Sequence, residues 1–316
     1  MQPITVTHFT DPGCPWAYSA SPAHATLRWR YGGQLDWRLV LIGLTEHSRQ
    51  YLDRGYTPLR QARGYRGFRR YGMPFATAPK DHVAATSRAC RAIVAAREIS
   101  PELGDAALRA LQFAQFNSTL ALDVDADLVG ALRGIDGLDA EDVVGRIDDD
   151  EVVAAYEADR ALARTAEGSP TAVQGKAAQT DGPVRYTAPS LIFRRGDAEL
   201  EAGGFQPVEA YDVLLANLDP ALERRPAPED PLAALEAEPQ GLMTAEIAEI
   251  MRSGNAPADR GAAEDALIAL AAEGTAVRVG LGDDALWIAG RYAAARFARA
   301  SSIAALNGVT PLVPAS

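Results

Sequence analysis

One cysteine stands where a protein chain can make a thiol reactive. Cys14 lies in the octet of residues 11–18 (DPGCPWAY), directly after a β-branched and aromatic run at 4–9 that predicts a strand. Pro15 suits the first turn of a helix that would follow. Backbone N–H groups and the positive end of the helix dipole stabilise a thiolate at such a junction. We therefore expect Cys14 to have a low thiol pKa and to act as a nucleophile.

The octet lacks a second cysteine. Ala17 stands where a Cys-x-x-Cys motif would end, and the only other cysteine of the chain is Cys90. Cys90 lies in an apolar helical pattern between alanines, which is typical of a small core residue. The alternative is that Cys90 resolves a disulfide formed at Cys14. The four histidines are scattered without ligand spacing, so we expect no metal site.

A second group with chemical potential is the span 45–80, where arginine and tyrosine alternate and acids are nearly absent. One interpretation is a lip that recognises the carboxylates of a small thiol or a substrate. The other is a solvated helix face whose arginine stems cover apolar surface. The candidate anion-binding residues are Arg63, Arg66, Arg69, Arg70 and Tyr71.

The elements around the octet begin as β-α-β. A helix over 15–31 would end at Gly32-Gly33, with a kink or short break at Pro22, and a second strand would cover 34–42. A helical crossover makes the two strands parallel. Helical spacing then covers 83–97, 103–116, 125–132 and 140–165. A strand after Pro189, a second strand at 198–202 and a helix near 207–215 complete this half.

A separate unit is expected at the C-terminal end. Prolines mark a linker over 221–238. Residues 239–316 then predict a winged-helix-like α+β domain, with a helix capped by Thr244, a helix at 259–272, a β-hairpin at 276–288 and a final helix at 292–306. From Glu229 onward there are twelve acids, six arginines and no lysine, a balance that opposes DNA binding. We expect this domain to dock on the thiol domain or to make dimer contacts.

The composition sets broader limits. The chain has 316 residues and a formal net charge of −11, which disfavours binding to nucleic acid or an anionic membrane. We see neither a signal peptide nor a run of about 18 apolar residues, and two cysteines are too few for a disulfide scaffold. We therefore expect a cytoplasmic protein.

The octet resembles the active-site segment of the DsbA-like thioredoxin-fold family, nearest to its FrnE-type and 2-hydroxychromene-2-carboxylate isomerase-like branch. Ala188-Pro189-Ser190 is similar to the family's cis-proline loop, and 203–206 to the turn before its last helix. The resemblance implies an α/β thioredoxin fold, with a core over 1–44 and 184–220 and an inserted helical domain over 45–183. It also implies that Cys14 is the nucleophile and that Pro189 faces it. Pro15, Trp16, Tyr18 and Ala188 would shape the site.

Three functions stay open on these residues. The first is a thiol oxidoreductase whose single cysteine forms a mixed disulfide with a small or protein disulfide, released by a low-molecular-weight thiol such as glutathione or mycothiol. The second is a transferase or isomerase that uses such a thiol on a small electrophile. The third is a binding protein without catalysis, with a possible homodimer. We expect no tightly bound cofactor in any of the three.

Overall fold

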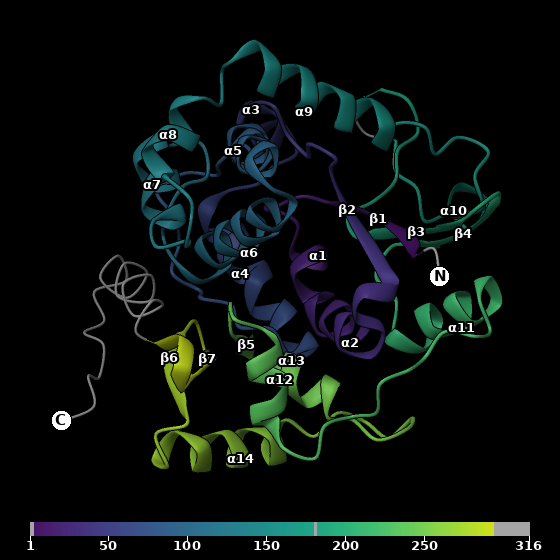
Figure 1. The fold of residues 1–316 in the computed structure, drawn as a ribbon. Coiled ribbons are helices and arrows are strands. Elements are labelled where there is room, and N and C mark those ends of the chain that lie inside the picture. Colours follow the sequence, from purple (N-terminus) through teal and green to yellow (C-terminus); the bar gives the residue numbers. More distant parts are fainter. Residues whose placement is uncertain (1–2, 180–181, 294–316) are drawn as a thin grey trace.

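The computed structural model describes residues 3–179 and 182–293. Its core is a four-stranded sheet in the order β2-β1-β3-β4. Strand β1 pairs in parallel with β2 and antiparallel with β3, and β3 pairs antiparallel with β4. The strands are β1 (Ile4–Thr10), β2 (Leu35–Leu41), β3 (Ser190–Arg195) and β4 (Ala198–Gly203). The strand positions and the parallel β1–β2 pair confirm the sequence predictions (Figure 1).

Helices cover both faces of this sheet. Helices α1 (Pro15–Ser19) and α2 (Ser21–Tyr31) are separated at Ala20, which confirms the break expected near Pro22. The turn Gly32–Gln34 leads from α2 into β2. On one face, Leu27 of α2 and Tyr211 of α11 (Val208–Leu218) are buried against β1 and β3. On the other face, β2 packs against the inserted helices.

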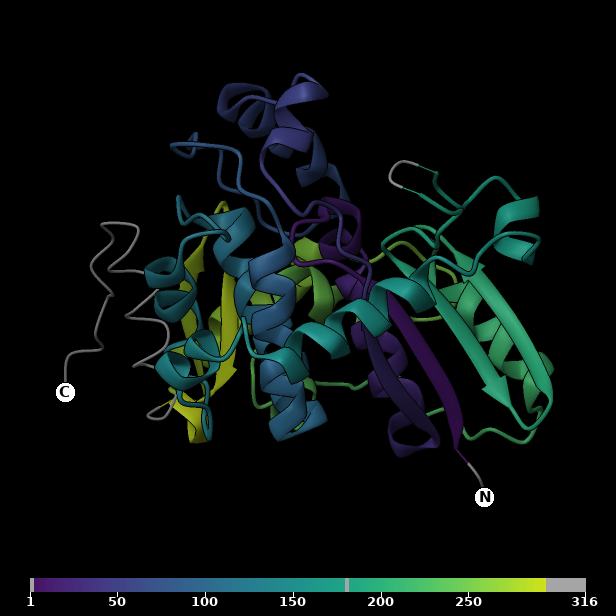
Figure 2. The same ribbon diagram turned by 90° about the horizontal axis from the view of Figure 1, so that it is seen from above.

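The insertion between β2 and β3 is helical, as expected. Its main core forms where α5 packs on α6 and α9, with alanines at the close contacts. Its elements are α3 (Arg49–Asp53), α4 (Pro58–Phe68), a short turn at Arg69–Tyr71, α5 (Ser87–Ile99), α6 (Pro101–Asn117), α7 (Asp125–Leu132), α8 (Ala140–Gly145), α9 (Asp150–Ala163) and α10 (Pro170–Val173). Helices α3 and α4 project from the rest of the insertion (Figure 2).

One prediction for the insertion is wrong. The stretch 140–165 forms two helices rather than one, because the chain leaves the helical conformation between Gly145 and Asp150. Asp149 takes an extended conformation there and starts the second helix. The apolar spacing continues across the break, so periodicity alone does not reveal it.

The C-terminal unit contains a second sheet, in the order β5-β7-β6. Its elements are α12 (Pro231–Ala237), β5 (Leu242–Met243), α13 (Thr244–Ile250), α14 (Arg260–Ala272), β6 (Ala276–Leu281) and β7 (Asp284–Ala289). Helix α12 lies inside the stretch expected as a linker. Thr244 is not the cap of α13 but its first residue, and its hydroxyl donates to Asp284 and accepts from Trp287 Nε1. The helix expected over 292–306 lies almost wholly outside the described residues.

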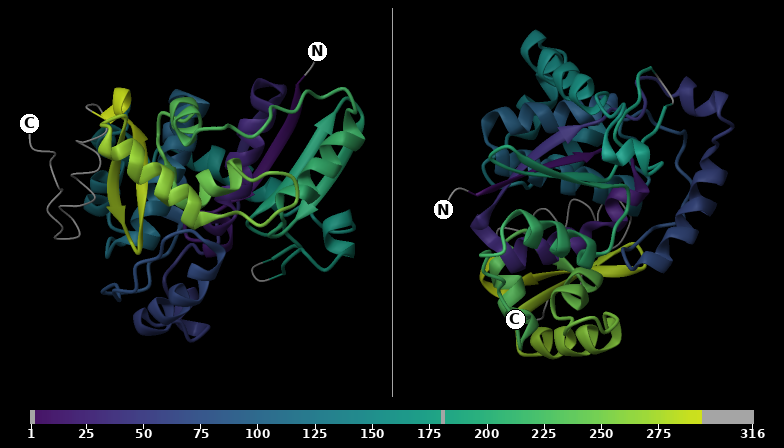
Figure 3. Two further views of the ribbon diagram at one scale, coloured as in Figure 1. Left: turned by 90° about the horizontal axis from the view of Figure 1, so that it is seen from below. Right: turned by 90° about the vertical axis from the view of Figure 1, so that its right-hand side faces the viewer.

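The C-terminal unit packs directly on the core that contains the four-stranded sheet, through α13 against α2 (Figure 3). Glu246 of α13 is fully buried at this contact. Its carboxylate accepts hydrogen bonds from Arg109 of α6 at 2.8 and 2.7 Å and from the hydroxyl of Ser21 of α2. One side chain therefore joins the core, the insertion and the C-terminal unit. Among the described helices, none combines the length and apolar character that crossing a membrane requires.

Candidate active site

Cys14 lies immediately before α1, as the octet predicts. It has an extended backbone conformation, its N–H donates to Asp11 O at 3.1 Å, and its carbonyl accepts from Tyr18 N at 3.1 Å. Its Sγ donates to the carbonyl oxygen of Ala188 at 3.1 Å, and the Ala188–Pro189 peptide is cis. The thiol is therefore brought against a loop that lies 174 residues away in the chain. The Cys14 residue is only 7% exposed.

A buried carboxylate lies under the octet. Asp11 accepts hydrogen bonds from Gly13 N and Leu44 N, both at 2.8 Å, and from the Thr86 hydroxyl at 3.0 Å. Gly13 is required here, because a β-carbon at this position would lie 2.4 Å from Thr86 Cγ2. The octet is thus fixed against the end of β2 and the start of α5. All the donors to Asp11 are neutral, and burial raises the pKa of its carboxyl.

The electrostatics of Cys14 contradict the expected low pKa. Burial raises the pKa of the thiol to about 12. The backbone N–H groups of Ala17 and Trp16 lower it, the charge of Asp11 raises it, and the charge of Arg185 lowers it. Helix α1 has only five residues, so its dipole is small, and burial outweighs the helix N-terminus. The prediction failed because it assumed an exposed thiol.

Cys90 is also a buried thiol that is not part of a disulfide. It lies on α5, and its Sγ donates to Asp11 Oδ2 at 3.5 Å. Burial and the charge of Asp11 raise the pKa of Cys90 well above its ordinary value. The same carboxylate therefore acts on both thiols of the chain. A role for Cys90 as the resolving thiol stays a prediction.

The structure adds two side chains that the motif analysis did not assign to the site. Arg185, buried before the Ala188–Pro189 loop, supplies the positive charge that favours the Cys14 thiolate. Tyr51 of α3 is the second: burial raises the pKa of its phenol most, and the charges of Asp11 and Cys14 raise it further. Tyr51 belongs to the arginine and tyrosine span, but no local pattern distinguishes it there. Arg185 carries no sequence signal, because its role depends on the packing of the loop.

An aromatic rim forms around Trp16, two residues after Cys14 in the chain. Trp16 is 39% exposed, and its ring lies 5.0 Å from Phe68, 5.1 Å from Tyr71 and 5.7 Å from Phe205, between ring centroids. Tyr71 and Phe205 are 5.2 Å apart. Three separate segments thus meet at Trp16: α1, the end of α4 with the turn that follows it, and the turn after β4. Sequence reasoning placed Trp16 at the site but missed Phe68 and Phe205.

The candidate arginines do not converge. Arg70 is at the rim, where its Nη2 donates to the Tyr71 hydroxyl at 2.8 Å and its guanidinium lies 4.8 Å from that ring. Arg69 turns to the C-terminal unit, donating to Phe75 O and pairing with Asp283 at 2.9 Å. Arg63 and Arg66 are exposed and form no ion pair within the described part of the chain. Among the described residues, the structure holds no group of three or more His, Cys, Asp or Glu side chains able to bind a metal.

Tyr18 and Ala17 lie on the inner side of the octet. Tyr18 is buried, stacks on Phe116 at 4.8 Å, and accepts a hydrogen bond from Asn117 Nδ2 at 3.0 Å. It supports α1 from the core instead of lining the rim. Ala17 is 3% exposed, so the position of the missing second cysteine also points inward.

Comparisons with known proteins concern the fold of the chain. No protein-family model and no curated protein sequence matches the chain significantly. A solved structure from Nitrosomonas europaea, provisionally described as a protein disulfide isomerase, is 19% identical with a TM-score of 0.51, over 68% of this chain and 97% of that chain. The cytosolic disulfide reductase DsbM from Pseudomonas aeruginosa is 21% identical with a TM-score of 0.48, over 69% and 100%. A 2-hydroxychromene-2-carboxylate isomerase is 14% identical with a TM-score of 0.41, over 68% and 95%.

Of these three structures, only the first is similar enough to support an argument, and it supports the fold. It is covered almost completely by this chain, while about a third of this chain has no counterpart in it. The chain therefore has the DsbA-like thioredoxin fold that its octet predicts.

Proposed function

We propose that the chain is a thiol–disulfide oxidoreductase with Cys14 as its single nucleophile. One observation carries the proposal: Cys14, at the start of α1, has its Sγ 3.1 Å from the carbonyl oxygen of Ala188. Ala17 occupies the position where a second cysteine would stand. The fold alone would also suit a protein without catalysis, so the proposal depends on this placement.

The reaction is two exchanges that balance without another oxidant. In the first, the Cys14 thiolate attacks a substrate disulfide, forming a mixed disulfide and releasing one substrate thiolate, which takes up the proton that Cys14 lost. In the second, a low-molecular-weight thiol attacks the mixed disulfide. Cys14 leaves and is protonated, and the small thiol departs in a disulfide with the substrate sulfur. In the net reaction, the substrate disulfide and the small thiol become one substrate thiol and a disulfide between the small thiol and the other substrate sulfur.

The raised pKa favours reduction over oxidation. Burial raises the pKa of Cys14 to about 12, so the neutral thiol predominates at pH 7. Strong thiol oxidants stabilise their thiolate, and this site does not. We therefore propose that the thiol form is the resting state and that the protein reduces disulfides. Its reaction rate should rise about tenfold per pH unit from pH 7 to pH 10, as the thiolate fraction grows.

For the small thiol, we propose that a carboxylate of glutathione binds at Arg70. Arg70 is exposed and stacked on Tyr71 of the rim, so its remaining N–H groups can bind a carboxylate next to Cys14. Arg69 is already engaged by Asp283 and is not part of this proposal.

For the C-terminal unit, we propose a winged-helix-like domain that serves as a docking module. The order helix, strand, two helices and two strands around a three-stranded sheet supports this assignment. Helix α14, which follows α13, carries one arginine and two acids, a charge balance that opposes contact with phosphates. Helix α13 is already used against α2.

The test of the oxidoreductase is intact-protein mass spectrometry with oxidised glutathione and with mycothiol disulfide, at pH 7 and pH 9. We expect one adduct on the wild type and on Cys90→Ser, more of it at pH 9, and none on Cys14→Ser. Absence of any adduct on the wild type at both pH values contradicts the proposal. A Cys14–Cys90 bridge in place of the adduct would replace the single-thiol scheme by a two-thiol one.

A further inference from the structure

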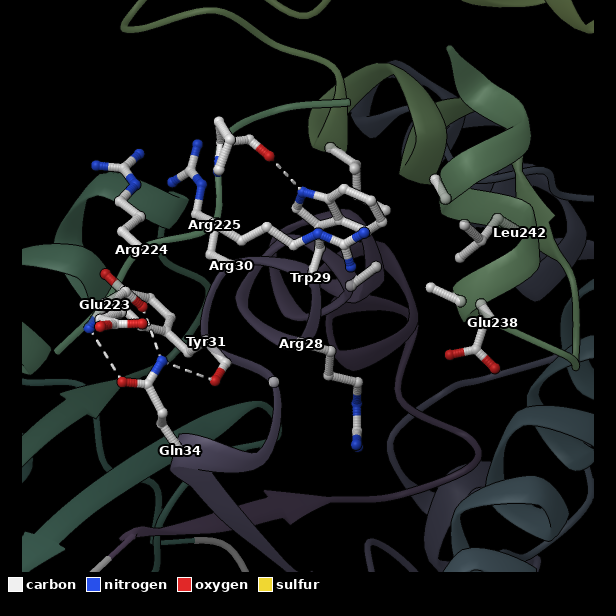
Figure 4. Close-up of a pocket in the computed structure, with 16 residues that line it drawn as sticks. Arg28, Trp29, Arg30, Tyr31, Gln34, Glu223, Arg224, Arg225, Glu238 and Leu242 are labelled. Carbon is white, nitrogen blue, oxygen red and sulfur yellow. Dashed lines mark hydrogen bonds between the residues drawn. The ribbon is translucent and has the colours of Figure 1, made fainter. Parts of the chain in front are cut away.

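A cavity of about 630 Å³ lies where the thioredoxin core meets the C-terminal unit. Helix α2, the segment after α11 and helix α12 form its walls (Figure 4). Cavities of this size at domain junctions are typical of small-molecule sites. The cavity does not include Cys14, so it is separate from the candidate active site.

One end of the cavity is rich in guanidinium groups. Arg30 and Arg224 share the carboxylate of Asp212, at 2.5 and 3.1 Å. Arg225 joins them on this side, and the described structure gives it no acidic partner (Figure 4). Four arginines (Arg28, Arg30, Arg224 and Arg225) and two glutamates (Glu223 and Glu238) line the cavity. The charged residues of the lining therefore carry a net positive charge, in a protein whose formal net charge is −11.

Hydrogen bonds hold the segment that carries Arg224 and Arg225. Arg225 N donates to Arg30 O at 2.8 Å, and Trp29 Nε1 donates to Pro226 O at 2.8 Å. Gln34 binds both backbone groups of Glu223, donating to its carbonyl at 2.7 Å and accepting from its N–H at 3.0 Å. The cationic end is therefore formed before any ligand arrives, which lowers the entropy that binding must overcome.

The other end of the cavity is mostly apolar. The Trp29 ring packs in one hydrophobic cluster with Ala234, Leu242 and Ile250, and all four line the cavity. The guanidinium of Arg225 lies 3.4 Å from the centre of the Trp29 ring, so the charged and apolar parts adjoin. Glu238, on the side away from the arginines in Figure 4, acts electrostatically on Arg109.

We propose that this cavity binds a small organic anion with an apolar body. Its carboxylate or phosphate would lie at Arg224 and Arg225, and its ring or alkyl part would lie along Trp29 toward Leu242. Arginine is suited to both head groups, because its N–H groups bind planar carboxylates and phosphates in pairs. The proposal is independent of thiol exchange at Cys14.

The experiment uses calorimetric titration of the full chain with three probes. These are 1-naphthoate, 1-naphthyl phosphate and the neutral 1-naphthylmethanol. We expect at least one of the two anions to bind, and the alcohol to bind at least tenfold more weakly. The anion that binds more tightly shows whether the cavity prefers a carboxylate or a phosphate. Binding should also weaken as sodium chloride is raised, because a charge pair contributes to it.

Two variants and a control locate the site. Arg225→Gln should weaken the better anion at least tenfold, and Ala237→Phe should weaken it by filling the cavity at its exposed edge. Arg278→Gln is the matched control, because Arg278 is an exposed arginine 5.7 Å from the Trp287 ring, outside the cavity. Each variant is first compared with the wild type by circular dichroism.

The proposal is overturned if neither anion binds at millimolar concentration, or if the alcohol binds as tightly as the anions. It is also overturned if Arg278→Gln weakens binding as much as Arg225→Gln, since the anion would then bind the surface at large. Failure here leaves the mass-spectrometric test of Cys14 unaffected.

Discussion

Two carboxylates in this protein are equally buried and electrostatically opposite. Asp11 under the octet and Glu246 at the junction of the three units are both 0% exposed. Glu246 accepts two hydrogen bonds from Arg109, and this pairing brings the pKa of its carboxyl below its usual value against the effect of burial. Asp11 accepts only from neutral groups, and burial raises the pKa of its carboxyl.

The difference shows what a cation changes at a buried acid. With a guanidinium at hydrogen-bond distance, the carboxylate is charged and joins distant parts of the chain. Without one, burial raises the pKa of the Asp11 carboxyl. Burial also raises the pKa of Cys14 and Cys90, and the charge of the ionised Asp11 carboxylate raises both pKa values further. We therefore assign Glu246 to the architecture and Asp11 to the control of the thiols. The following changes test that assignment.

The largest effect is expected at the junction. Glu246→Gln leaves Arg109 buried without its counter-charge, which should lower the free energy of unfolding by about 3–5 kcal/mol. Urea unfolding followed by circular dichroism measures it. Glu141→Gln removes one partner of the exposed pair with Arg133 and should leave the urea midpoint unchanged. Equal midpoints for Glu246→Gln and the wild type would remove the distinction between the two carboxylates.

A buried pair of histidines gives the next largest effect. His8 of β1 and His24 of α2 are buried with ring centroids 4.7 Å apart, and burial lowers the pKa of His24 from 6.5 to about 3. The unfolded chain therefore binds more protons than the folded chain between pH 6.5 and pH 3. Stability should fall by about 3 kcal/mol between pH 7 and pH 4 from His24 alone.

The measurement is urea unfolding at several pH values for the wild type and His24→Gln. The variant should lose most of this pH dependence below pH 6.5. His47→Gln is the matched control, because His47 lies before α3, outside the buried pair. Parallel curves for His24→Gln and the wild type would show that acid sensitivity comes from the carboxylates instead.

A smaller effect is expected when the charge under the octet is removed. Asp11→Asn should lower the pKa of Cys14, because the Asp11 charge raises it, while burial keeps it above the ordinary thiol value. A shift of about one unit would make alkylation of Cys14 by iodoacetamide about tenfold faster at pH 8. Asp159→Asn is the control. Asp159 is a mostly buried acid paired with Arg97, and its replacement should leave the alkylation rate of Cys14 unchanged. An unchanged rate in Asp11→Asn would mean that burial alone sets the thiol pKa.

The smallest effect concerns the contact between the C-terminal unit and the rim. Asp283 accepts from Phe75 N at 2.8 Å and pairs with Arg69, both partly exposed. Asp283→Ala should lower the unfolding free energy by about 1 kcal/mol or less, and should speed amide exchange in 58–71. Asp265→Ala, on the exposed side of α14, serves as the control. Unchanged exchange in 58–71 would show that the C-terminal unit does not steady the rim.

Local sequence patterns predicted most of the strands and helices of this protein. They did not predict the electrostatic interactions between residues that are distant in the chain. Strands β1 and β2, the Cys14 junction and the break before α2 follow from periodicity, proline and glycine. Glu246 lies in the first turn of α13, a position that favours an acid. Its ion-pair partner Arg109 lies 137 residues away, and no local pattern indicates that pairing. The pKa of Cys14 depends on burial under a loop that local sequence does not position. That is why the placement of the thiol was predicted and its ionisation was not.

The pairing of β1 with β3 has a consequence for biosynthesis. Cys14 leaves the ribosome early, but Ala188, the residue that covers its sulfur, is translated 174 residues later. Until then β1 has only β2 as a partner, and closing so long a loop delays assembly of the sheet. During synthesis the sulfur is thus more exposed than in the finished protein, where the Cys14 residue is 7% exposed. A chain stalled before Ala188 should be trapped by thiol reagents at Cys14 far faster than the released protein.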